Sequence, residues 1–436
     1  MKVAFVSNYI NHHQIPFCDE MDRLTKGNFT FVQTQVMEAE RVRMGWHEER
    51  PAYVRCWYEE EFFCRELLMD CDVALFGGTD DESFIQERLA AGKMTVRISE
   101  RLYKTGQWKA VSPRGLRKKY FDHTCYRNAP VYLLCAGAYV PSDFHIVRAY
   151  PGKMYCWGYF PETRRYDISE LMGQKGWTAE KVPRLLWAGR MIDWKHPELA
   201  LETARYLKNS GISFHMDIVG DGELKNRMET MRHSYGLESC VSLPGAQPPE
   251  QVRRYMERAD IFLFTSDRQE GWGAVANEAM NSGCVLVADH MIGAVPYLVK
   301  PGENGFVYRD GKRGELFSLA ERLATDGQLC RSVGEKAYRT IVETWNAENA
   351  AARLVELLEN LAVLKGGGES GAAVKGIDST ADTFGPENVS LKNCFQGELY
   401  PCAPAPVLSE WGAMRKVRHS YQHDRKSADH GDHTDI

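Results

Sequence analysis

The stretch DIFLFTSDRQEGWGAVANEAMNSGCVLVAD, residues 260–289, contains the unit from which the fold can be inferred. Its two apolar runs, 260–266 and 284–289, have the length and composition of buried strands. Between them lie a glycine-containing loop and a segment of small residues that predicts a helix from Ala274 onward. A strand, a helix and a second strand in this order indicate a βαβ unit of a parallel sheet.

Similar apolar runs recur on the N-terminal side of this stretch. They occupy residues 2–7, 29–33, 72–78, 94–98, 131–135, 184–190, 214–220 and 241–245. Their nearly continuous hydrophobicity is typical of strands that are buried on both faces. A chain of 436 residues is also too long for one hydrophobic core. We therefore expect an α/β fold with two Rossmann-like, doubly wound domains that face a cleft.

Composition suggests where one domain ends and the next begins. Glycine, proline and charged residues interrupt the pattern at GYFPETRRYD, residues 158–167. We predict domains over 1–163 and 164–345, then a closing helix over 346–365 that packs back toward the first domain. Residues 366–436 begin with the flexible composition GGGESGAAVKG and are expected to form a linker and a disordered tail. The tail histidines are interpreted as chance clustering rather than a metal site: His419, His423, His430 and His433.

Bulk composition excludes several classes of protein. The net charge of -5 provides no overall attraction to nucleic acid, and no nucleic-acid-binding motif is present. The cysteines are scattered without a CxxC pair, which favours reduced thiols over disulfides or a zinc site. The first apolar run is too short for a signal peptide or a membrane span. We expect a cytoplasmic protein, with peripheral contact at the inner face of a membrane left open.

Ligands of open parallel sheets bind beyond the carboxyl ends of the strands, so the loops after the strands carry the candidate site. After the run 184–190, Arg190 and Lys195 provide a planar fork and a point charge that together could hold a diphosphate. Two solvated surface cations are the alternative. After the run 214–220, Gly222 either lets the backbone approach a ligand or only forms a tight turn.

Two carboxylates, Glu270 and Glu278, lie eight positions apart in the opening stretch. The glycine turn that leads into the helix at Ala274 is a natural place for an anion. No cation lies three or four positions from Glu278 on this helix, which is built from small and apolar residues. A buried carboxylate without a partner is costly, so we expect one from outside the helix. Ligand hydroxyls and a salt bridge from elsewhere in the chain both meet this requirement.

Taken together, these motifs resemble a known family. The pattern E-x7-E is preceded by GRMIDWKHPELALETA (189–204) and IVGDGELKNRM (218–228), and followed by NSGCVLVADHMIGAVPYLVKPGENGFVY (281–308). From about 184 to 309 the chain closely resembles retaining GT-B glycosyltransferases, in particular the family 4 group that builds bacterial surface polysaccharides. The final helix after Trp345 also resembles the closing element of that family.

The resemblance implies a role for each candidate. Arg190 and Lys195 would neutralise the diphosphate of a UDP- or GDP-sugar as it leaves, and Glu270 would bind the transferred sugar. The remaining residues expected to bind the donor are Gly222, Gly271, Trp272, Gly273, Ala274 and Glu278, the last of them through the ribose. The implied reaction retains configuration through a same-face mechanism, so no nucleophile is nominated. It also needs neither a metal ion nor a cofactor.

The first domain would then bind the acceptor, a growing surface glycan or a lipid-linked saccharide. Many relatives carry a glycine-rich loop after the first strand, where this chain has SNYINHHQIPF (7–17). His12 and His13 in that segment could meet a substrate, or could be core or capping histidines. Glu100 and Arg101 follow a strand and could also face the cleft. Tyr297 stands where the family usually has a carboxylate.

A basic and aromatic segment, SPRGLRKKYFDHTCYR (112–127), is the last feature of interest. Such a segment can dock on an anionic membrane surface, although a charge run on a helix is more often its solvated face. Two other functions fit the same architecture: a degenerate subunit that only binds a nucleotide-sugar, and a sugar-nucleotide epimerase. A phosphorylase would need a cofactor lysine motif that the chain lacks.

Overall fold

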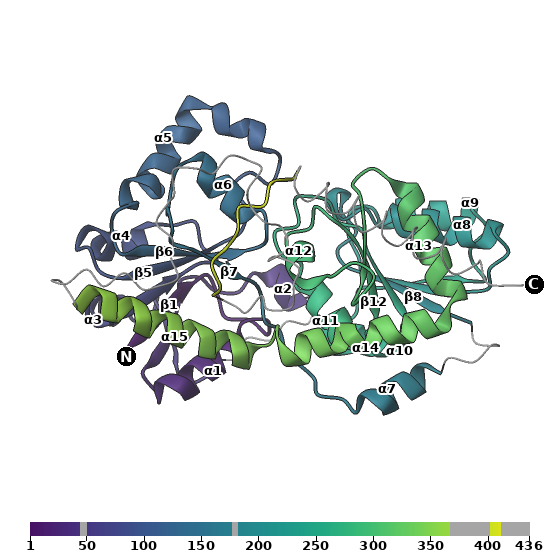
Figure 1. Cartoon of the computed structure of the whole chain (residues 1–436), viewed down its shortest axis with the longest axis horizontal. Coiled ribbons are helices and arrows are strands. Elements are labelled where there is room, and N and C mark those ends of the chain that lie inside the picture. Colours follow the sequence, from purple (N-terminus) through teal and green to yellow (C-terminus); the bar gives the residue numbers. More distant parts are fainter. Residues whose placement is uncertain (44–49, 177–181, 367–401, 411–436) are drawn as a thin grey trace, which may run out of the picture.

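The structure, a computed structural model, describes residues 1–43, 50–176, 182–366 and 402–410. Two α/β domains lie side by side along the long axis of the molecule (Figure 1), and each is built around one parallel sheet. The expected fold class, two doubly wound domains, is confirmed.

The first domain contains a seven-stranded sheet in the order β3-β2-β1-β4-β5-β6-β7, with parallel pairing throughout. The strands are β1 Val3–Ser7, β2 Phe29–Gln33, β3 Val54–Cys56, β4 Val73–Phe76, β5 Thr95–Ser99, β6 Val131–Ala136 and β7 Met154–Trp157. The helices are α1 Ile15–Thr25, α2 Ala39–Arg43, α3 Glu61–Asp70, α4 Ser83–Ala90, α5 Pro113–Asp122 and α6 Val140–Ile146, with the short 3-10 helices η1 Gln107–Val111 and η2 Thr124–Tyr126. Every residue of β1 is buried, as its continuous hydrophobicity predicts.

The second domain contains a six-stranded parallel sheet in the order β10-β9-β8-β11-β12-β13. Its strands are β8 Arg184–Ala188, β9 His215–Val219, β10 Val241–Gly245, β11 Ile261–Phe264, β12 Val285–Asp289 and β13 Phe306–Tyr308. Its helices are α7 Ile168–Lys175, η3 Asp193–Lys195, α8 Glu198–Asn209, α9 Lys225–Ser234, α10 Pro249–Arg258, α11 Val275–Asn281, α12 Val295–Leu298, α13 Arg313–Thr325 and α14 Gly327–Glu343. The strand order reverses between β8 and β11, which creates the crevice where such sheets bind ligands.

Each apolar run named from the sequence is a strand, but three further strands had no sequence prediction. These are β3, β7 and β13, and all three lie at the edge of a sheet. An edge strand has a neighbour on one side only, so a short run with few apolar residues is enough to form it. The strands β3 and β13 have three residues each, too few to show a periodicity.

The segment between β7 and α7 contains neither helix nor strand and leads into the second domain, where α7 packs against α10 and α14. The long helix α15, Ala347–Gly366, returns to the first domain and packs against α1 (Figure 1). One hydrophobic cluster continues from the first domain into the second and includes Phe160, Trp272 and Trp345. The ring of Trp345 stacks on Phe160 and on Tyr297, each at 6.1 Å between centroids. The two domains therefore share part of their core.

Residues 402–410 differ from the expected disordered tail. They run antiparallel beside β7, where the amide of Cys156 donates to the carbonyl of Ala403 at 2.8 Å. Leu408 is buried, and Glu410 accepts from Arg101 at 2.8 Å. An unpaired edge strand offers backbone donors and acceptors, which explains why a tail segment can bind there. The remainder of 366–436, including the predicted linker and the histidines, lies outside the described residues apart from the last residue of α15. Among the described helices, none is both long and apolar enough to cross a membrane.

Candidate active site

The carboxyl ends of the second sheet bring the sequence candidates together. Lys195 lies in η3 after β8, and Glu270 follows β11, so the two residues flank the crevice where the strand order reverses. The Nζ of Lys195 is 2.5 Å from Glu270 Oε2, and both side chains are largely buried. Ser266 Oγ donates to the same carboxylate oxygen at 2.9 Å. Glu270 therefore has a basic partner from a distant loop, and the two charges neutralise each other in this state.

The backbone behind Lys195 is fixed by hydrogen bonds. Thr265 Oγ1 donates to the Lys195 carbonyl, and the Trp187 indole donates to Thr265 Oγ1, each at 2.8 Å. These bonds join the end of β8 to the end of β11. The position of the lysine is thus set by the sheet rather than by a free loop.

His196, which the sequence reading missed, reinforces the same junction. Its Nδ1 is 3.1 Å from Glu198 Oε1, and its Nε2 is 3.6 Å from Asp267 Oδ2 in the loop after β11. The carboxylate of Asp267, followed by that of Glu198, raises the pKa of His196 to about 10. The imidazolium therefore links two strand-end loops at neutral pH. A histidine between a lysine and a proline carries no distinctive signal, because its partners lie elsewhere in the chain.

We expect His196→Asn to lower the melting temperature at pH 7 by a few degrees, roughly the effect of 1 kcal/mol. Asparagine tolerates the left-handed backbone found here, φ 47°. Because folding raises the pKa of His196 above 6.5, its contribution is complete below pH 6.5 and is lost as the pH rises through about 10. Melting curves from pH 6 to 10 should show the two proteins converge at high pH. A difference that does not change with pH would contradict this account.

Arg190 also follows β8 and is half-buried. Its loop packs tightly on the next one. A Cβ on Gly222, which has φ 153°, would lie 2.6 Å from the carbonyl oxygen of Met191, and a Cβ on Gly220 would lie 1.8 Å from that of Gly189. The glycines after β9 are therefore required for packing against the Arg190 loop. This explains the turn residue Gly222 without a ligand.

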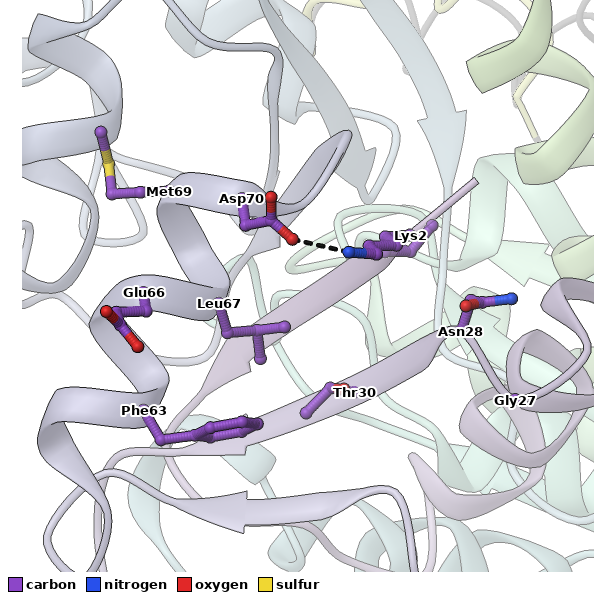
Figure 2. A pocket seen from close by; sticks show the side chains of 10 residues that line it. Lys2, Gly27, Asn28, Thr30, Phe63, Glu66, Leu67, Met69 and Asp70 are labelled. Carbon is purple, nitrogen blue, oxygen red and sulfur yellow. Dashed lines mark hydrogen bonds and ion pairs between the residues drawn. The ribbon is translucent and has the colours of Figure 1, made fainter.

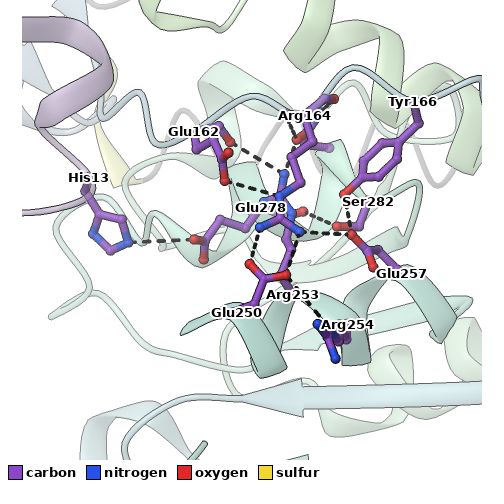
Figure 3. A network of polar contacts seen from close by, with 11 residues as sticks. His13, Glu162, Arg164, Tyr166, Glu250, Arg253, Arg254, Glu257, Glu278 and Ser282 are labelled. Atoms are coloured by element: carbon purple, nitrogen blue, oxygen red, sulfur yellow. Dashed lines mark hydrogen bonds and ion pairs between the residues drawn. The ribbon is translucent and has the colours of Figure 1, made fainter. Parts of the chain in front are cut away.

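Glu278 has its partner on the other side of the cleft. His13 Nε2, in the loop after β1, lies 3.8 Å from Glu278 Oε1, as Figure 3 shows. Burial pushes the pKa of Glu278 upward, but His13, then Arg253 and His12, outweigh it and hold the pKa below its usual value. The expected partner from outside the helix thus exists, and it comes from the first domain.

The other first-domain candidates also lie at this cleft. The ring of His12 is 4.0 Å from that of His13, and burial, followed by the charge of His13, lowers the pKa of His12 to about 4. Glu100 accepts from Tyr159 at 2.7 Å and from Lys104 at 2.5 Å. A Cβ on Gly271 would lie 2.1 Å from Glu100 Oε2, so this carboxylate lies against the loop after β11.

Other candidates are held by contacts inside the protein. Arg101 is fully buried and pairs with Asp143 and Glu410. The side chain of Trp272 is fully buried and its indole donates to Asn277 at 2.9 Å, so only its backbone is available to a donor. Tyr297 lies in the same aromatic cluster, 6.4 Å from Trp272, and contributes to the core between the domains.

Two of the cavities in the described part of the first domain differ in their position relative to the cleft. One, of about 840 Å³, is lined by His13, Glu100 and Tyr159 at the cleft and by Lys119 on α5. The other, of about 730 Å³, lies at the amino ends of β1 and β2, between the Lys2–Asp70 ion pair and Phe63, as Figure 2 shows. Only the first cavity opens at the carboxyl ends of the strands. Within the described ranges, no three His, Cys, Asp or Glu side chains gather as metal ligands would.

Known proteins resemble the part of the chain that carries most of these residues. Residues 170–340, which run from α7 into α14, match the family model of glycosyl transferases group 1, and Arg190, Lys195, Glu270 and Glu278 all lie inside the match. Over 185 residues the chain is 33% identical to the amylovoran biosynthesis glycosyltransferase AmsK of Erwinia amylovora. The alignment covers 41% of this chain and 45% of AmsK. The putative colanic acid biosynthesis glycosyltransferase WcaL of Escherichia coli is 28% identical over 186 residues, 41% of this chain and 45% of WcaL. The chain thus spans less than half the length of these relatives, and the predicted resemblance is confirmed for this part.

Solved structures extend the likeness to both domains. Anabaena HepE in complex with UDP and glucose has a TM-score of 0.60 and 15% identity, over 82% of this chain and 99% of that protein. WaaG, a glycosyltransferase involved in lipopolysaccharide biosynthesis, has a TM-score of 0.55 and 15% identity over the same shares. At this identity the likeness shows the fold alone, which is the GT-B arrangement of two Rossmann-like domains.

Proposed function

We propose that the chain is a retaining, metal-independent glycosyltransferase that moves a hexose-type sugar from a nucleoside diphosphate donor to an acceptor hydroxyl. The observation that carries the proposal is the contact of Lys195 with Glu270 at the crevice of the sheet, inside the matched region. Arg190 follows the same strand. A cation pair and a carboxylate at this edge suit a diphosphate and a sugar bound next to each other.

The chemistry follows from where charge develops. When the bond from the anomeric carbon to the phosphate oxygen breaks, negative charge grows on the diphosphate and positive charge on the sugar ring. Arg190 and Lys195 would stabilise the diphosphate, and they would do so more strongly in the transition state than in the ground state. The diphosphate would compete with Glu270 for Lys195, which would free Glu270 to accept from sugar hydroxyls. The ion pair of Lys195 with Glu270 holds both side chains at the crevice.

Glu278 would bind the ribose of the donor. Its depressed pKa keeps it ionised at neutral pH, so both oxygens accept hydrogen bonds. A ribose with two adjacent hydroxyls offers two donors to one carboxylate. The contact of Glu278 with His13 would then link nucleotide binding to the position of the first domain.

For retention we propose a same-face displacement. Of the carboxylates nearest the proposed sugar site, Glu270 would accept from the sugar hydroxyls, and Glu100 is held by Tyr159 and Lys104. No nucleophile is therefore assigned. The acceptor oxygen bonds to the anomeric carbon as the phosphate leaves, and its proton passes to a phosphate oxygen.

The acceptor we propose is a hydroxyl of a growing surface glycan or of a lipid-linked saccharide. It would occupy the cavity of about 840 Å³ that meets the cleft at His13 and Glu100. The cavity mixes aromatic, amide and charged side chains, and such a lining suits a saccharide with many hydroxyls and few large apolar faces.

The deciding experiment screens UDP-, GDP- and ADP-sugars for binding and slow hydrolysis, with and without a metal chelator. We expect one donor class to be hydrolysed without loss in the chelator, and the first sugar released to keep its anomeric configuration by NMR. Glu278→Gln should raise the KM for that donor ~10–100-fold, because this is the loss of affinity expected when a hydrogen bond to a charged group is weakened. The matched control is Glu250→Gln, an exposed carboxylate paired with Arg164, which should leave KM within about twofold.

The alternatives predict other results. Binding without turnover, with and without added saccharides, would indicate a nucleotide-sugar-binding subunit, and release of an epimerised donor would indicate an epimerase. Absence of binding to every donor would contradict the assigned roles of Glu270 and Glu278.

A further inference from the structure

An exposed apolar surface surrounds η1 and α5 in the first domain. Trp108, Val111 and Phe121 have 69%, 80% and 56% of their surface exposed, and Leu116 and Tyr120 are exposed beside them. None of the side chains of α5, a helix that lies wholly within the described residues, is buried. Large exposed apolar groups gathered in one place mark an interaction surface more often than chance. We call η1 and α5 together the α5 surface.

The charge of the α5 surface is mainly positive, and its acidic residue is Asp122 at the end of α5, which pairs with Lys118 at 2.7 Å. From Lys104 to Phe121 the chain carries no acidic residue. The cations of the surface are Lys109, Arg114, Arg117, Lys118 and Lys119. The whole chain has a net charge of -5, so this positive region is local and is not a consequence of composition. A local positive patch with apolar groups complements a surface that is anionic outside and apolar beneath.

The exposed residues are held by a rigid base. Gln107 donates to Ser142 Oγ at 3.0 Å and to Asp143 Oδ1 at 2.9 Å, and Ala110 is buried. Ser112 caps the first turn of α5 by accepting from the amide of Gly115. Trp108 and Val111 therefore project from anchored turns, and their exposure is a property of the folded domain.

Two cations of this surface lie close to its aromatic rings. Lys109 is 5.6 Å from the ring centre of Trp108, and the Arg117 guanidinium is 5.9 Å from that of Phe121. In the headgroup region of a bilayer, aromatic rings and cationic groups occupy one layer, with phosphates at the same depth. A nucleic acid would satisfy the cations but would leave Val111 and Leu116 without an apolar partner.

The opposite side of the same helix reaches the candidate acceptor site. Lys118, Lys119 and Asp122 line the cavity that meets the cleft at Glu100. Burial lowers the pKa of Lys119, although the charge of Asp122 opposes this. An anion that binds there would pair with an ammonium group that is already partly removed from water. The cavity thus extends from the cleft to the helix whose outer residues are apolar and basic.

We propose that the α5 surface docks the first domain on a bilayer with anionic headgroups, and that the cavity there receives an acceptor whose lipid end stays in that bilayer. The sugar end would lie at Glu100, and the phosphate that joins sugar to lipid would lie at Lys118 and Lys119. The second half rests on the proposed glycosyl transfer, whereas the docking itself does not.

Sedimentation with vesicles tests the docking independently of activity. The full chain should bind vesicles of phosphatidylglycerol and phosphatidylcholine, bind weakly to phosphatidylcholine alone, and release as salt is raised. Arg114→Ala with Arg117→Ala should weaken binding roughly 30-fold, since each cation near an anionic surface contributes about fivefold. Trp108→Ser with Val111→Ser should weaken it at least tenfold, because both side chains lose apolar burial.

Matched controls change the same chemistry elsewhere. Arg254→Ala with Arg258→Ala removes two exposed arginines from α10, one of them 5.2 Å from the Tyr255 ring centre. Phe62→Ser with Phe63→Ser removes exposed aromatic side chains from α3. Both controls should bind vesicles like the original protein, and circular dichroism melting should show that all four variants fold.

Three results would overturn the proposal. The first is a lack of binding of the original protein to anionic vesicles at low salt. The second is binding that the α5 variants retain. The third is an original protein that self-associates and does not bind vesicles, and whose oligomers dissociate when Trp108→Ser and Val111→Ser are introduced. That result would identify the partner of the α5 surface as a second copy of the chain. If the protein bound vesicles but turned over no donor, the proposed glycosyl transfer would be rejected and the proposed membrane docking would be retained.

Discussion

Replacing Gly293 by alanine should reduce turnover at least ~100-fold and lower the melting temperature. A Cβ at this position would lie 1.7 Å from the carbonyl oxygen of Gly271, a backbone atom that cannot rotate away. The amide of Gly293 donates to the Glu270 carbonyl at 3.2 Å, and its carbonyl accepts from Ala138 of the first domain at 2.8 Å. An added methyl group therefore pushes the Glu270 loop and the domain contact at the same time.

The size of this effect follows from geometry. A shift of about 1 Å in a catalytic group costs ~10²-fold in rate, and overpacking costs about 1–3 kcal/mol of stability. Turnover of the selected donor and thermal melting measure the two effects. Gly314→Ala is the matched control, because Gly314 lies in α13 with nothing within 4 Å of its added Cβ. It should keep full activity and gain roughly 0.5–1 kcal/mol from helix propensity. A Gly293→Ala protein with unchanged turnover would refute the tight packing described here.

Lys195→Ala should lower kcat at saturating donor by ~10²–10³, the usual cost of one group that stabilises developing negative charge. The effect should appear in kcat because the lysine acts mainly on the departing diphosphate. Lys225→Ala is the control, since this exposed lysine lies after the neighbouring strand and pairs with Asp221 at 3.0 Å. It should change kcat by less than about twofold.

Loss of Lys195 also leaves the largely buried Glu270 without its cation, so a stability effect must be separated from a catalytic one. The double substitution Lys195→Ala with Glu270→Gln removes both charges and should recover most of the lost melting temperature. Turnover should stay low in the double variant. Recovery of turnover together with stability would assign Lys195 a purely structural role.

Much of the fold follows from local sequence, because continuous apolar runs report strands that are buried on both faces. The carboxyl ends of parallel strands meet at one edge, so locating β8 and β11 was enough to bring Arg190, Lys195 and Glu270 to one place. The strands β3, β7 and β13 were not predicted because they have only three or four residues each. The ordered segment 402–410 was not predicted because it binds to the free edge of β7, a strand that the sequence pattern did not indicate.

The sequence by itself therefore determined the class of fold and the strand ends that carry polar groups. Only the tertiary structure decided which charges meet: Lys195 with Glu270, which are 75 positions apart, and Glu278 with His13 across the cleft. It also decided that Trp272 belongs to the core, although it looks like a loop residue. The physical reason is that periodicity depends on neighbours along one element, whereas ion pairing and burial depend on surfaces that meet only after the chain has folded.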